Sequence, residues 1–396
     1  MLKKDDPPGA PAYDSTLNGR RIVFVLFNLE LGGAERQALI LAGHLVEHER
    51  AAVEVWGFNK SGPVAQICEQ LGVPWRVVSF PLKAGCVARF ASLARVALSL
   101  RRARPDILLP YTFLPNVVCG LLWRWTGARA CVWNQRDEGV TPFVAEWARA
   151  AACRTPVFVS NSEPGAWFLV DELHVDRAKV RIIENGISSS LPECDREAWR
   201  ARLDIRDDTF VACMVANLHD NKDHETLLKA WRRVVDSVNG RNAVLVLAGR
   251  HDGAFQSLAE LSQELNLEGH VRFAGQVFDV PGLLSAVDLG VFSSVAEGCP
   301  NGVLESMAAG LAVAGTNIDG IRSVLGPGGL QFLAPPKDDE ALAGAILRLA
   351  NDSGLRGSVG AENRQRVKEK YTAERMCETT VGVLKDALLA VSGTPR

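Results

Sequence analysis

Two glutamates, Glu297 and Glu305, enclose a short loop whose residue types could bind an elongated polar ligand. The loop follows an apolar run typical of a buried strand, so it would lie at the carboxyl end of that strand, where open α/β sheets bind ligands. A helix is expected to begin near Asn301, which is an acceptable N-cap residue. The first N–H groups of that helix, on Gly302 and Val303, would lack intrahelical partners and could bind an anion such as a diphosphate.

The spacing of the two carboxylates places one on the loop and the other one turn into the helix. They could therefore contact opposite ends of a ligand that carries hydroxyl groups at both ends. Gly302 has no side chain that would keep a diphosphate away from the backbone. The alternative is a pair of surface carboxylates beside an ordinary strand–helix turn, and a bare pair at this spacing would favour that alternative.

The elements that must position this loop alternate between short apolar runs and helical stretches. In the first half, strands are predicted at 21–27, 52–56, 107–109, 131–133, 157–159 and around 180–187, with a helix over 34–48. In the second half they are predicted at 210–215, 243–247, 270–273, 289–292 and 311–314, before a helix-rich end over 338–392. Strands separated by enough chain for a crossover helix predict parallel sheets. The fold class is therefore α/β, with two Rossmann-like, doubly wound domains facing each other across a cleft.

A chain of 396 residues is too long for one ordinary core, so two domains are expected. We place the first domain at 1–187, with a flexible polar start over 1–19, the second at 188–374, and a C-terminal helix at 375–396. The content of 47% apolar and 23% charged residues is typical of a soluble globular protein. The net charge of −2 gives no argument for a nucleic-acid partner.

The nine cysteines are scattered, and no two of them form a Cys-x-x-Cys pair. This pattern disfavours a disulfide framework or a zinc site and favours a reducing cytoplasm. The polar, proline-rich N-terminus lacks the apolar core of a signal peptide, and the longest apolar runs are far shorter than the ~20 residues that span a bilayer. We therefore expect a cytoplasmic protein that is at most peripheral on the inner face of the cell membrane.

With its glycine, proline and asparagine filling, the segment from Glu297 to Glu305 resembles the signature of the retaining glycosyltransferases of family 4, the "group 1" family with the GT-B fold. The resemblance implies that Glu297 contacts the sugar of a nucleotide-sugar donor and that Glu305 binds the ribose hydroxyls. The residues that would hold the sugar and the phosphates between them are Gly298, Cys299, Pro300, Asn301, Gly302 and Val303. The GT-B fold also implies a C-terminal helix that crosses back to the first domain.

Other segments resemble the same family along nearly the whole chain. Gly32 and Gly33 belong to a glycine-rich turn that would lie beside the diphosphate, although a tight turn with a positive φ explains two glycines equally well. Lys222 would place its ammonium on the departing diphosphate, where negative charge grows. Val277 belongs to a segment that would lie near the nucleotide base.

Asn217 and Tyr111 depart from the family pattern. Asn217 stands where the family places an arginine of its basic pair, so it keeps the hydrogen bonding but not the charge. Tyr111 stands where many members have a histidine. Arg136, at an expected strand end beside the cleft, is either a substitute cation or the partner of an adjacent carboxylate in a buried salt bridge. The candidate catalytic residues are therefore Glu297, Lys222, Tyr111 and Arg136.

The resemblance implies transfer of a sugar, with retention, from a nucleotide-diphosphate sugar to a glycan, lipid-linked or small-molecule acceptor, with UDP favoured over GDP. No Asp-x-Asp occurs at a strand end, so no metal and no further cofactor are expected. Two alternatives stay open. One is a sugar-nucleotide 2-epimerase on the same scaffold, although no histidine can be assigned to its acid–base chemistry. The other is a nucleotide-sugar-binding protein without turnover, which the departures at Asn217 and Tyr111 would mark.

The stretch between Glu69 and Asp106 contains no acidic residue. Apolar residues recur there at helical spacing, so a basic amphipathic helix over 83–104 could lie on an anionic membrane surface. Its neighbourhood is basic through Arg76, Lys83, Arg89, Arg95, Arg101, Arg102 and Arg104. The alternative is a helix packed on the core with a solvated basic face, and core packing also explains the nearby Trp123 and Trp125 more simply.

Overall fold

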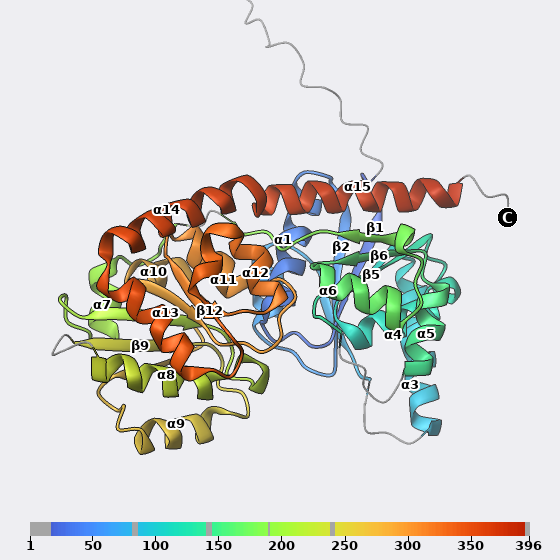
Figure 1. Ribbon diagram of the computed structural model, residues 1–396. Helices are drawn as coiled ribbons and strands as arrows, with labels where there is room; N and C mark the ends of the chain where they lie inside the picture. Colours follow the sequence, from blue (N-terminus) through green and yellow to red (C-terminus); the bar gives the residue numbers. More distant parts are fainter. Residues whose placement is uncertain (1–16, 81–85, 140–144, 189–190, 238–241, 393–396) are drawn as a thin grey trace, which may run out of the picture.

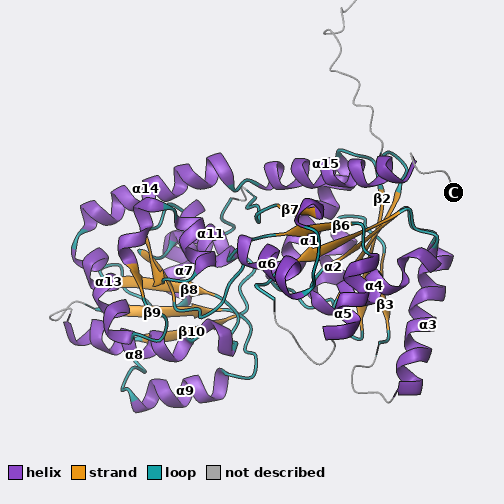
Figure 2. Ribbon diagram, turned by 45° about the vertical axis from the view of Figure 1, so that its right-hand side comes forward, coloured by secondary structure: helices purple, strands orange, loops and turns teal. Residues whose placement is uncertain are grey.

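The computed structural model describes residues 17–80, 86–139, 145–188, 191–237 and 242–392. They form two domains, each built on one parallel sheet with helices around it, as Figures 1 and 2 show. Of the start expected to be flexible, residues 1–16 lie outside the described residues. Leu17, in contrast, is fully buried in the core of the first domain, so the packed part of the chain begins earlier than predicted.

The N-terminal domain has a seven-stranded sheet in the order β3-β2-β1-β4-β5-β6-β7. Its strands are β1 (Arg21–Leu26), β2 (Ala52–Phe58), β3 (Trp75–Val78), β4 (Ile107–Pro110), β5 (Ala130–Gln135), β6 (Val157–Ser160) and β7 (Val180–Ile182). Its helices are α1 (Gly33–Glu47), α2 (Pro63–Gln70), α3 (Cys86–Ala103), α4 (Phe113–Thr126), α5 (Ala145–Arg154) and α6 (Glu163–Trp167), the last continued by a π-helical turn, η1 (Phe168–Glu172), and followed by a 3₁₀ turn, η2 (Arg177–Lys179).

The C-terminal domain has a six-stranded sheet in the order β10-β9-β8-β11-β12-β13. Its strands are β8 (Phe210–Val215), β9 (Ala243–Ala248), β10 (Val271–Gly275), β11 (Leu289–Phe292), β12 (Val313–Thr316) and β13 (Leu333–Ala334). The elements around them are α7 (Arg196–Arg202), η3 (Asp220–Lys222), α8 (His224–Ser237), α9 (Phe255–Glu264), α10 (Val280–Ser285), α11 (Asn301–Ala308), α12 (Asp319–Leu325), η4 (Pro327–Phe332) and α13 (Asp339–Asn351).

Alternate residues of the central strands pack on opposite faces of each sheet. In β1, Phe24 belongs to one buried cluster and Val25 to another, and in β8, Met214 and Cys213 are separated in the same way. A strand buried on both faces is a continuous apolar run, because helices cover both sides of a parallel sheet. This is the doubly wound arrangement that the sequence predicts.

The last two helices connect the domains. Figure 1 shows α14 (Ser353–Lys370) along the C-terminal domain and α15 (Ala373–Ser392) along the N-terminal domain. Between them, the Ile187 N–H donates to the Tyr371 carbonyl (2.8 Å), and the Ala373 N–H donates to the Ile187 carbonyl (3.1 Å). Buried residues of α15, such as Cys377 and Leu384, join the core of the N-terminal domain. The chain therefore crosses back to its first domain, as expected.

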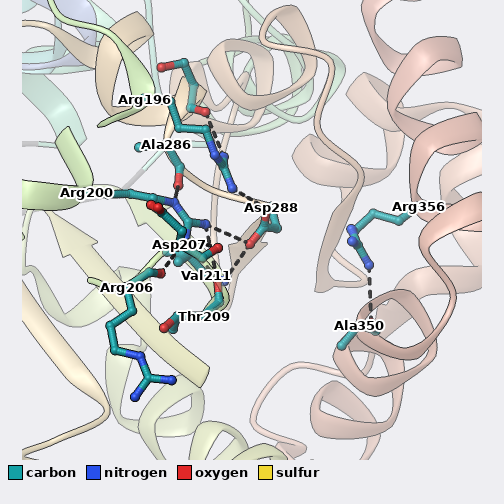
Figure 3. Close-up of polar contacts among 11 residues, drawn as sticks. Arg196, Arg200, Arg206, Asp207, Thr209, Val211, Ala286, Asp288, Ala350 and Arg356 are labelled. Carbon is teal, nitrogen blue, oxygen red and sulfur yellow. Dashed lines mark hydrogen bonds and ion pairs between the residues drawn. The ribbon is translucent and has the colours of Figure 1, made fainter. Parts of the chain in front are cut away.

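A buried arginine, Arg200, connects several segments at the amino ends of the strands of the C-terminal sheet. Figure 3 shows that the guanidinium of Arg200, on α7, lies among the carbonyl groups of Ala286 (3.0 Å) and Thr209 (3.2 Å) and the carboxylate of Asp288 (3.3 Å). Asp288 also accepts from the Val211 N–H at 2.8 Å. The cluster fixes α7 against the start of β8 and the turn that leads into β11.

Candidate functional site

A pocket of about 500 Å³ lies between the two domains. One wall combines the start of α1 with the segments after β5, β6 and β7, and the other combines the segments after β8, β9, β10 and β11. All of these strand ends are carboxyl ends of parallel strands, which is where doubly wound sheets bind ligands. The cleft expected between the domains is therefore a pocket to which both domains contribute.

Most of the residues predicted from the sequence meet in this pocket. Its lining includes Gly32, Gly33, Arg136, Asn217, Lys222, Val277, Glu297, Gly298, Cys299, Pro300, Asn301, Gly302 and Glu305. Tyr111 and Val303 are not part of the lining. Val303 is fully buried in the core of the C-terminal domain, so only its backbone could serve a ligand.

Glu305 forms an ion pair with Arg36 of the other domain, with 2.8 Å between Nη1 and Oε1. The carboxyl group lies on α11 and is well shielded from solvent. Burial raises its pKa, and the Arg36 guanidinium lowers it again in part. A buried carboxylate without a cation would be costly, so this arginine offsets part of the penalty for holding a charge there. The carboxylate predicted to bind a ribose is thus stabilised from across the cleft.

Glu297 is held by three contacts on the loop after β11. Its Oε1 forms an ion pair with Lys222 and accepts from the Ser294 hydroxyl at 2.7 Å. Its backbone N–H donates to Oε1 of Glu138, from the N-terminal domain, at 3.0 Å. Burial raises the pKa of Glu138, the Glu297 N–H lowers it, and the Glu297 charge raises it further. Two carboxylates and one ammonium therefore gather at the loop that carries Glu297.

Asn301 does not cap α11, contrary to the expectation from sequence. Pro300 holds the cap position without a side-chain bond, and Asn301 is the first helical residue. Its amide donates to the Gly33 carbonyl (3.0 Å) and accepts from Nδ2 of Asn185 (2.7 Å). Gln37 adds a weaker bond to the same oxygen at 3.3 Å. The side chain is used to join the two domains rather than to satisfy its own helix, because partners from the other domain lie within reach.

Close packing requires the glycine at position 302, whereas no positive φ requires those at positions 32 and 33. Neither Gly32 nor Gly33 has a positive φ, which excludes the tight-turn explanation. A Cβ on Gly33 would lie 3.2 Å from Nδ2 of Asn301, and a Cβ on Gly302 would lie 2.2 Å from the Val215 carbonyl oxygen. Gly302 thus lets α11 start directly against β8, which brings the first N–H groups of the helix into the pocket wall.

Arg250 lies beside Asn217, the position at which the sequence lacks the cation typical of the family. Oδ1 of Asn217 accepts from the Arg250 N–H at 3.1 Å. The Arg250 guanidinium pairs with Asp252 (2.7 Å) and donates to the Leu31 carbonyl, next to Gly32, at 3.3 Å. A positive charge is therefore present near Asn217, although it comes from another segment and is shared with a carboxylate.

Arg136 lines the pocket, and Tyr111 lies behind it. The guanidinium stacks on the Tyr111 ring at 4.7 Å and donates to Oδ1 of Asn185 (3.3 Å) and Oδ1 of Asn134 (3.1 Å). Burial raises the pKa of Tyr111, and Arg136 lowers it in part. Among the described residues, Arg136 forms no ion pair with the adjacent Asp137, whose carboxylate accepts from Gln135 and from the Gly139 N–H instead. Tyr111 is therefore placed to position Arg136, not to touch a ligand.

Sequence reasoning missed four residues of this site. From the N-terminal domain, Arg36 pairs with Glu305, and Glu138 accepts from the Glu297 N–H. Asn185 bonds to Asn301, and Arg250 bonds to Asn217. Arg36 and Glu138 do follow segments that the sequence pattern singles out, at the glycine turn and after β5. Their partners, however, are 269 and 159 residues away, and no local pattern specifies such pairs.

Two family models match adjoining parts of the chain. "Glycosyltransferase Family 4" matches residues 31–191, and "Glycosyl transferases group 1" matches residues 195–369. The fold and the pocket define the class as a two-domain α/β protein with a pocket between its domains. Within this class, the chain belongs to the group 1 glycosyltransferases.

Relatives with known names agree with this assignment. The chain is 25% identical over 309 residues to an Escherichia coli UDP-Gal:α-D-GlcNAc-diphosphoundecaprenol α-1,3-galactosyltransferase, covering 75% of this chain and 80% of that protein. It is 29% identical over 303 residues to the lipopolysaccharide core biosynthesis glycosyltransferase LpsE of Rhizobium meliloti, covering 75% and 82%. The match to the Bacillus subtilis putative glycosyltransferase EpsD, at 29% identity, spans only about half of either chain, 46% and 48%.

Solved structures confirm the GT-B fold class. HepE of Anabaena, in complex with UDP-glucose, superimposes with a TM-score of 0.80 at 19% identity and covers 92% of this chain and 99% of that one. WaaG, a glycosyltransferase involved in lipopolysaccharide biosynthesis, gives a TM-score of 0.71 at 17% identity, covering 91% and 99%. At these identities the likeness concerns the fold.

Proposed function

We propose that this group 1 glycosyltransferase transfers a hexose or related sugar from a nucleoside-diphosphate sugar to a glycan, lipid-linked or small-molecule acceptor. The observation that carries the proposal is the pocket between the domains, in which Glu305, the start of α11 and the Lys222–Glu297 pair lie along one wall. A nucleoside-diphosphate sugar has hydroxyls at both ends and a charged centre, and this wall offers carboxylates at both ends and N–H groups between them.

In the proposed complex, Glu305 accepts hydrogen bonds from the ribose hydroxyls and Glu297 accepts them from the sugar. The first N–H groups of α11 face the diphosphate, where a helix N-terminus favours negative charge. Lys222 would donate to the leaving diphosphate as its charge grows. Since these groups supply the positive charge, we propose that transfer proceeds without a metal. Among the described residues, no cluster of three or more metal-ligating side chains occurs.

We propose retention at the anomeric carbon, with the acceptor attacking the face that the nucleotide leaves. We propose that Arg136 and Glu138 contact the acceptor, because they line the pocket from the N-terminal domain. The name of the Escherichia coli relative, whose acceptor is a diphosphoundecaprenol-linked sugar, supports a lipid-linked acceptor here as well. It also supports UDP as the nucleotide, as do the UDP complexes of HepE.

The proposal is tested first with a thermal-shift panel of UDP, GDP, ADP and dTDP and their sugars, because a ligand of the folded state raises its stability. We expect a shift with UDP and a larger one with its matching sugar. Glu297→Ala should keep the shift with UDP and lose the sugar-dependent increment. Equal shifts for this variant and the wild type would contradict the assignment of Glu297.

Turnover is tested by nucleotide release in the presence of a lipid-linked or glycan acceptor. Lys222→Ala should lower kcat by roughly 10²–10³-fold, the effect of removing one group that stabilises a developing anion. The matched control is Lys229→Ala, because Lys229 is exposed on α8 and pairs only locally with Glu225. Binding of the donor without release or transfer would favour the binding protein without turnover, and an epimerised donor in the absence of acceptor would favour the 2-epimerase.

We also propose that the protein works in the cytoplasm, peripherally on the inner face of the cell membrane, where a lipid-linked acceptor would be within reach. No helix in the described part of the chain is long and apolar enough to cross a bilayer. A peripheral location requires a surface that holds the protein on lipid.

A further inference from the structure

Helix α3 presents an exposed row of arginines at the outer side of the N-terminal domain. Arg95, Arg101 and Arg102 on the helix, and Arg104 just after it, are all exposed. Asp106, the first acidic residue after them, is engaged by the Arg21 N–H (2.9 Å) and by Arg20 (3.4 Å). The row of positive charges is therefore not neutralised by acidic residues of its own segment.

A surface hollow lies where the end of α3 meets the end of α4. Arg101 donates to the Trp125 carbonyl at 3.4 Å, which joins the two helix ends. The residues that line the hollow are Arg21, Leu98, Arg101, Arg102, Arg104, Arg124, Trp125, Thr126 and Gly127. Five of these nine residues are arginines, so the hollow suits a ligand with phosphate groups.

Large apolar side chains are exposed on the same helices. Trp125 is 73% exposed and Leu98 is 54% exposed, both beside the arginine hollow. Near the start of α3, Phe90 is 63% exposed, and its ring lies tilted against that of Trp147 of α5, with 6.3 Å between the ring centroids. Trp123, two residues from Trp125, is buried and donates to the Arg154 carbonyl, so core packing explains Trp123 but not Trp125.

The face of α3 that packs on the domain is not the one that carries its exposed apolar residues. Ser92, Val96 and Leu100 pack on the domain, whereas Phe90 and Leu98 point outward. Lys83 and the side chains of Val87 and Arg89 lie outside the described residues. The helix thus packs on the core with one face and still carries apolar residues among its arginines on the other, which a helix needed only for core packing would not require.

This surface is remote from the donor pocket. Figures 1 and 2 both show α3 at the end of the N-terminal domain that is farthest from the C-terminal domain. No residue of the arginine hollow belongs to the lining of the interdomain pocket. A ligand on α3 would therefore leave the donor pocket open.

We propose that α3 and the end of α4 form a docking surface for an anionic bilayer, with lipid phosphates in the arginine hollow and Trp125, Leu98 and Phe90 in the interfacial layer. Cations interleaved with aromatic and aliphatic side chains fit a lipid surface, which offers both charge and a hydrocarbon boundary. The inference gives a site to the membrane partner of the proposed function. Donor binding does not depend on it, so the two can fail separately.

The first test is co-sedimentation with vesicles, using the full chain. We expect binding to vesicles of phosphatidylglycerol and phosphatidylcholine in equal parts, loss of binding as salt rises to 1 M, and much weaker binding to pure phosphatidylcholine. Equal binding to both vesicles would overturn the proposal. So would tighter binding of a mixed-sequence single-stranded RNA than of anionic vesicles, because RNA also presents phosphates to arginines and bases to tryptophan.

Variants locate the surface. Each cation near an anionic bilayer contributes about fivefold to binding, so Arg102→Glu with Arg124→Glu should weaken vesicle binding by roughly thirtyfold or more. The matched control reverses two exposed charges of α14, Arg364→Glu with Lys368→Glu, and should change it little.

The apolar part of the surface has its own pair of variants. Trp125→Ser should weaken the binding that survives at moderate salt, whereas Leu191→Ser, at an exposed position between the domains, should not. All variants should keep the wild-type UDP thermal shift, which shows that they fold. Vesicle binding that is unchanged in both α3–α4 variants would refute this location, whatever the outcome of the donor assays.

Discussion

Replacement of Glu305 by glutamine should weaken nucleotide binding without weakening the fold. Glutamine keeps the size of the side chain and one carbonyl oxygen, but it removes the charge and turns one acceptor into a donor. A hydrogen bond to a charged group contributes about 1.5–3 kcal/mol and a neutral one about 0.5–1.5 kcal/mol, so each ribose bond loses about 1 kcal/mol. Two ribose hydroxyls then lose about 2 kcal/mol together, which is roughly a thirtyfold weaker affinity for UDP.

The fold should tolerate this change because the buried, charged carboxylate of Glu305 does not add to the unfolding free energy. Burial raises the pKa of Glu305, so its contribution to the unfolding free energy is largest below its unfolded pKa and is lost as the pH rises through the folded value. At pH 7.5 the glutamine variant should therefore unfold at the same temperature as the wild type or at a higher one. Arg36 is partly exposed and can be solvated once its partner is neutral.

The assay is calorimetric titration with UDP, 2′-deoxy-UDP and 2′,3′-dideoxy-UDP. If Glu305 binds the ribose, removal of each hydroxyl should cost about 2 kcal/mol in the wild type and about 1 kcal/mol in Glu305→Gln, which keeps only neutral hydrogen bonds. The control is Glu225→Gln, since this exposed glutamate lies on α8 and forms a local ion pair with Lys229. A penalty for the deoxynucleotides that is the same in Glu305→Gln and in the wild type would refute the assignment.

Three further predictions concern stability. Arg200→Met should lower the unfolding free energy of the C-terminal domain by about 1–3 kcal/mol in urea, because it leaves the buried carbonyls of Ala286 and Thr209 without their donor and Asp288 with Arg196 as its remaining cation, whereas Arg206→Met, at an exposed position, should leave the urea midpoint unchanged. Burial raises the pKa of Glu35 from 4.5 to about 7, so its contribution to the unfolding free energy is lost as the pH rises through that range. The unfolding free energy of Glu35→Gln should therefore exceed that of the wild type by up to about 3 kcal/mol at pH 8 and should match it at pH 4.5. An equal difference at both pH values would contradict this reasoning. Gly302→Ala should lower both the melting temperature and the UDP affinity, because its Cβ would meet the Val215 carbonyl. The control is Gly344→Ala on α13, whose Cβ meets nothing within 4 Å and which should stabilise the fold by about 0.5–1 kcal/mol. An unchanged melting temperature in Gly302→Ala would contradict the packing argument.

The central strands could be predicted from the sequence because their burial on both faces leaves a continuous apolar run. β8 and β11 have the predicted bounds, and β1 differs by one residue. Two of the edge strands, β3 and β13, could not be predicted in this way. β3 has two exposed residues among its four, and β13 has two residues in all, so neither leaves a run of buried residues that a pattern could detect.

In the candidate site, too, the part that is continuous in the sequence was the part that could be predicted. The loop from Glu297 to Glu305 is continuous in the sequence, and its spacing alone predicts a carboxylate at each end of a strand–helix turn. The family resemblance added Lys222 and the glycine turn, which the structure places in the same pocket. Helix α3 was also visible in the sequence as an acid-free stretch with apolar residues at helical spacing, although the face that it buries could not be read from that pattern.

The sequence by itself therefore determined the class of fold, the order of its elements and the loop that carries the two glutamates, because each of these depends on periodicities within a few residues of chain. Only the tertiary structure decided that Arg36 supports Glu305, that Glu138 binds the Glu297 N–H, and that Asn301 turns away from its helix to join Gly33. Each of these contacts crosses from one domain to the other. The partners meet only because the carboxyl ends of two separate sheets face each other, and no pattern within either domain encodes that meeting.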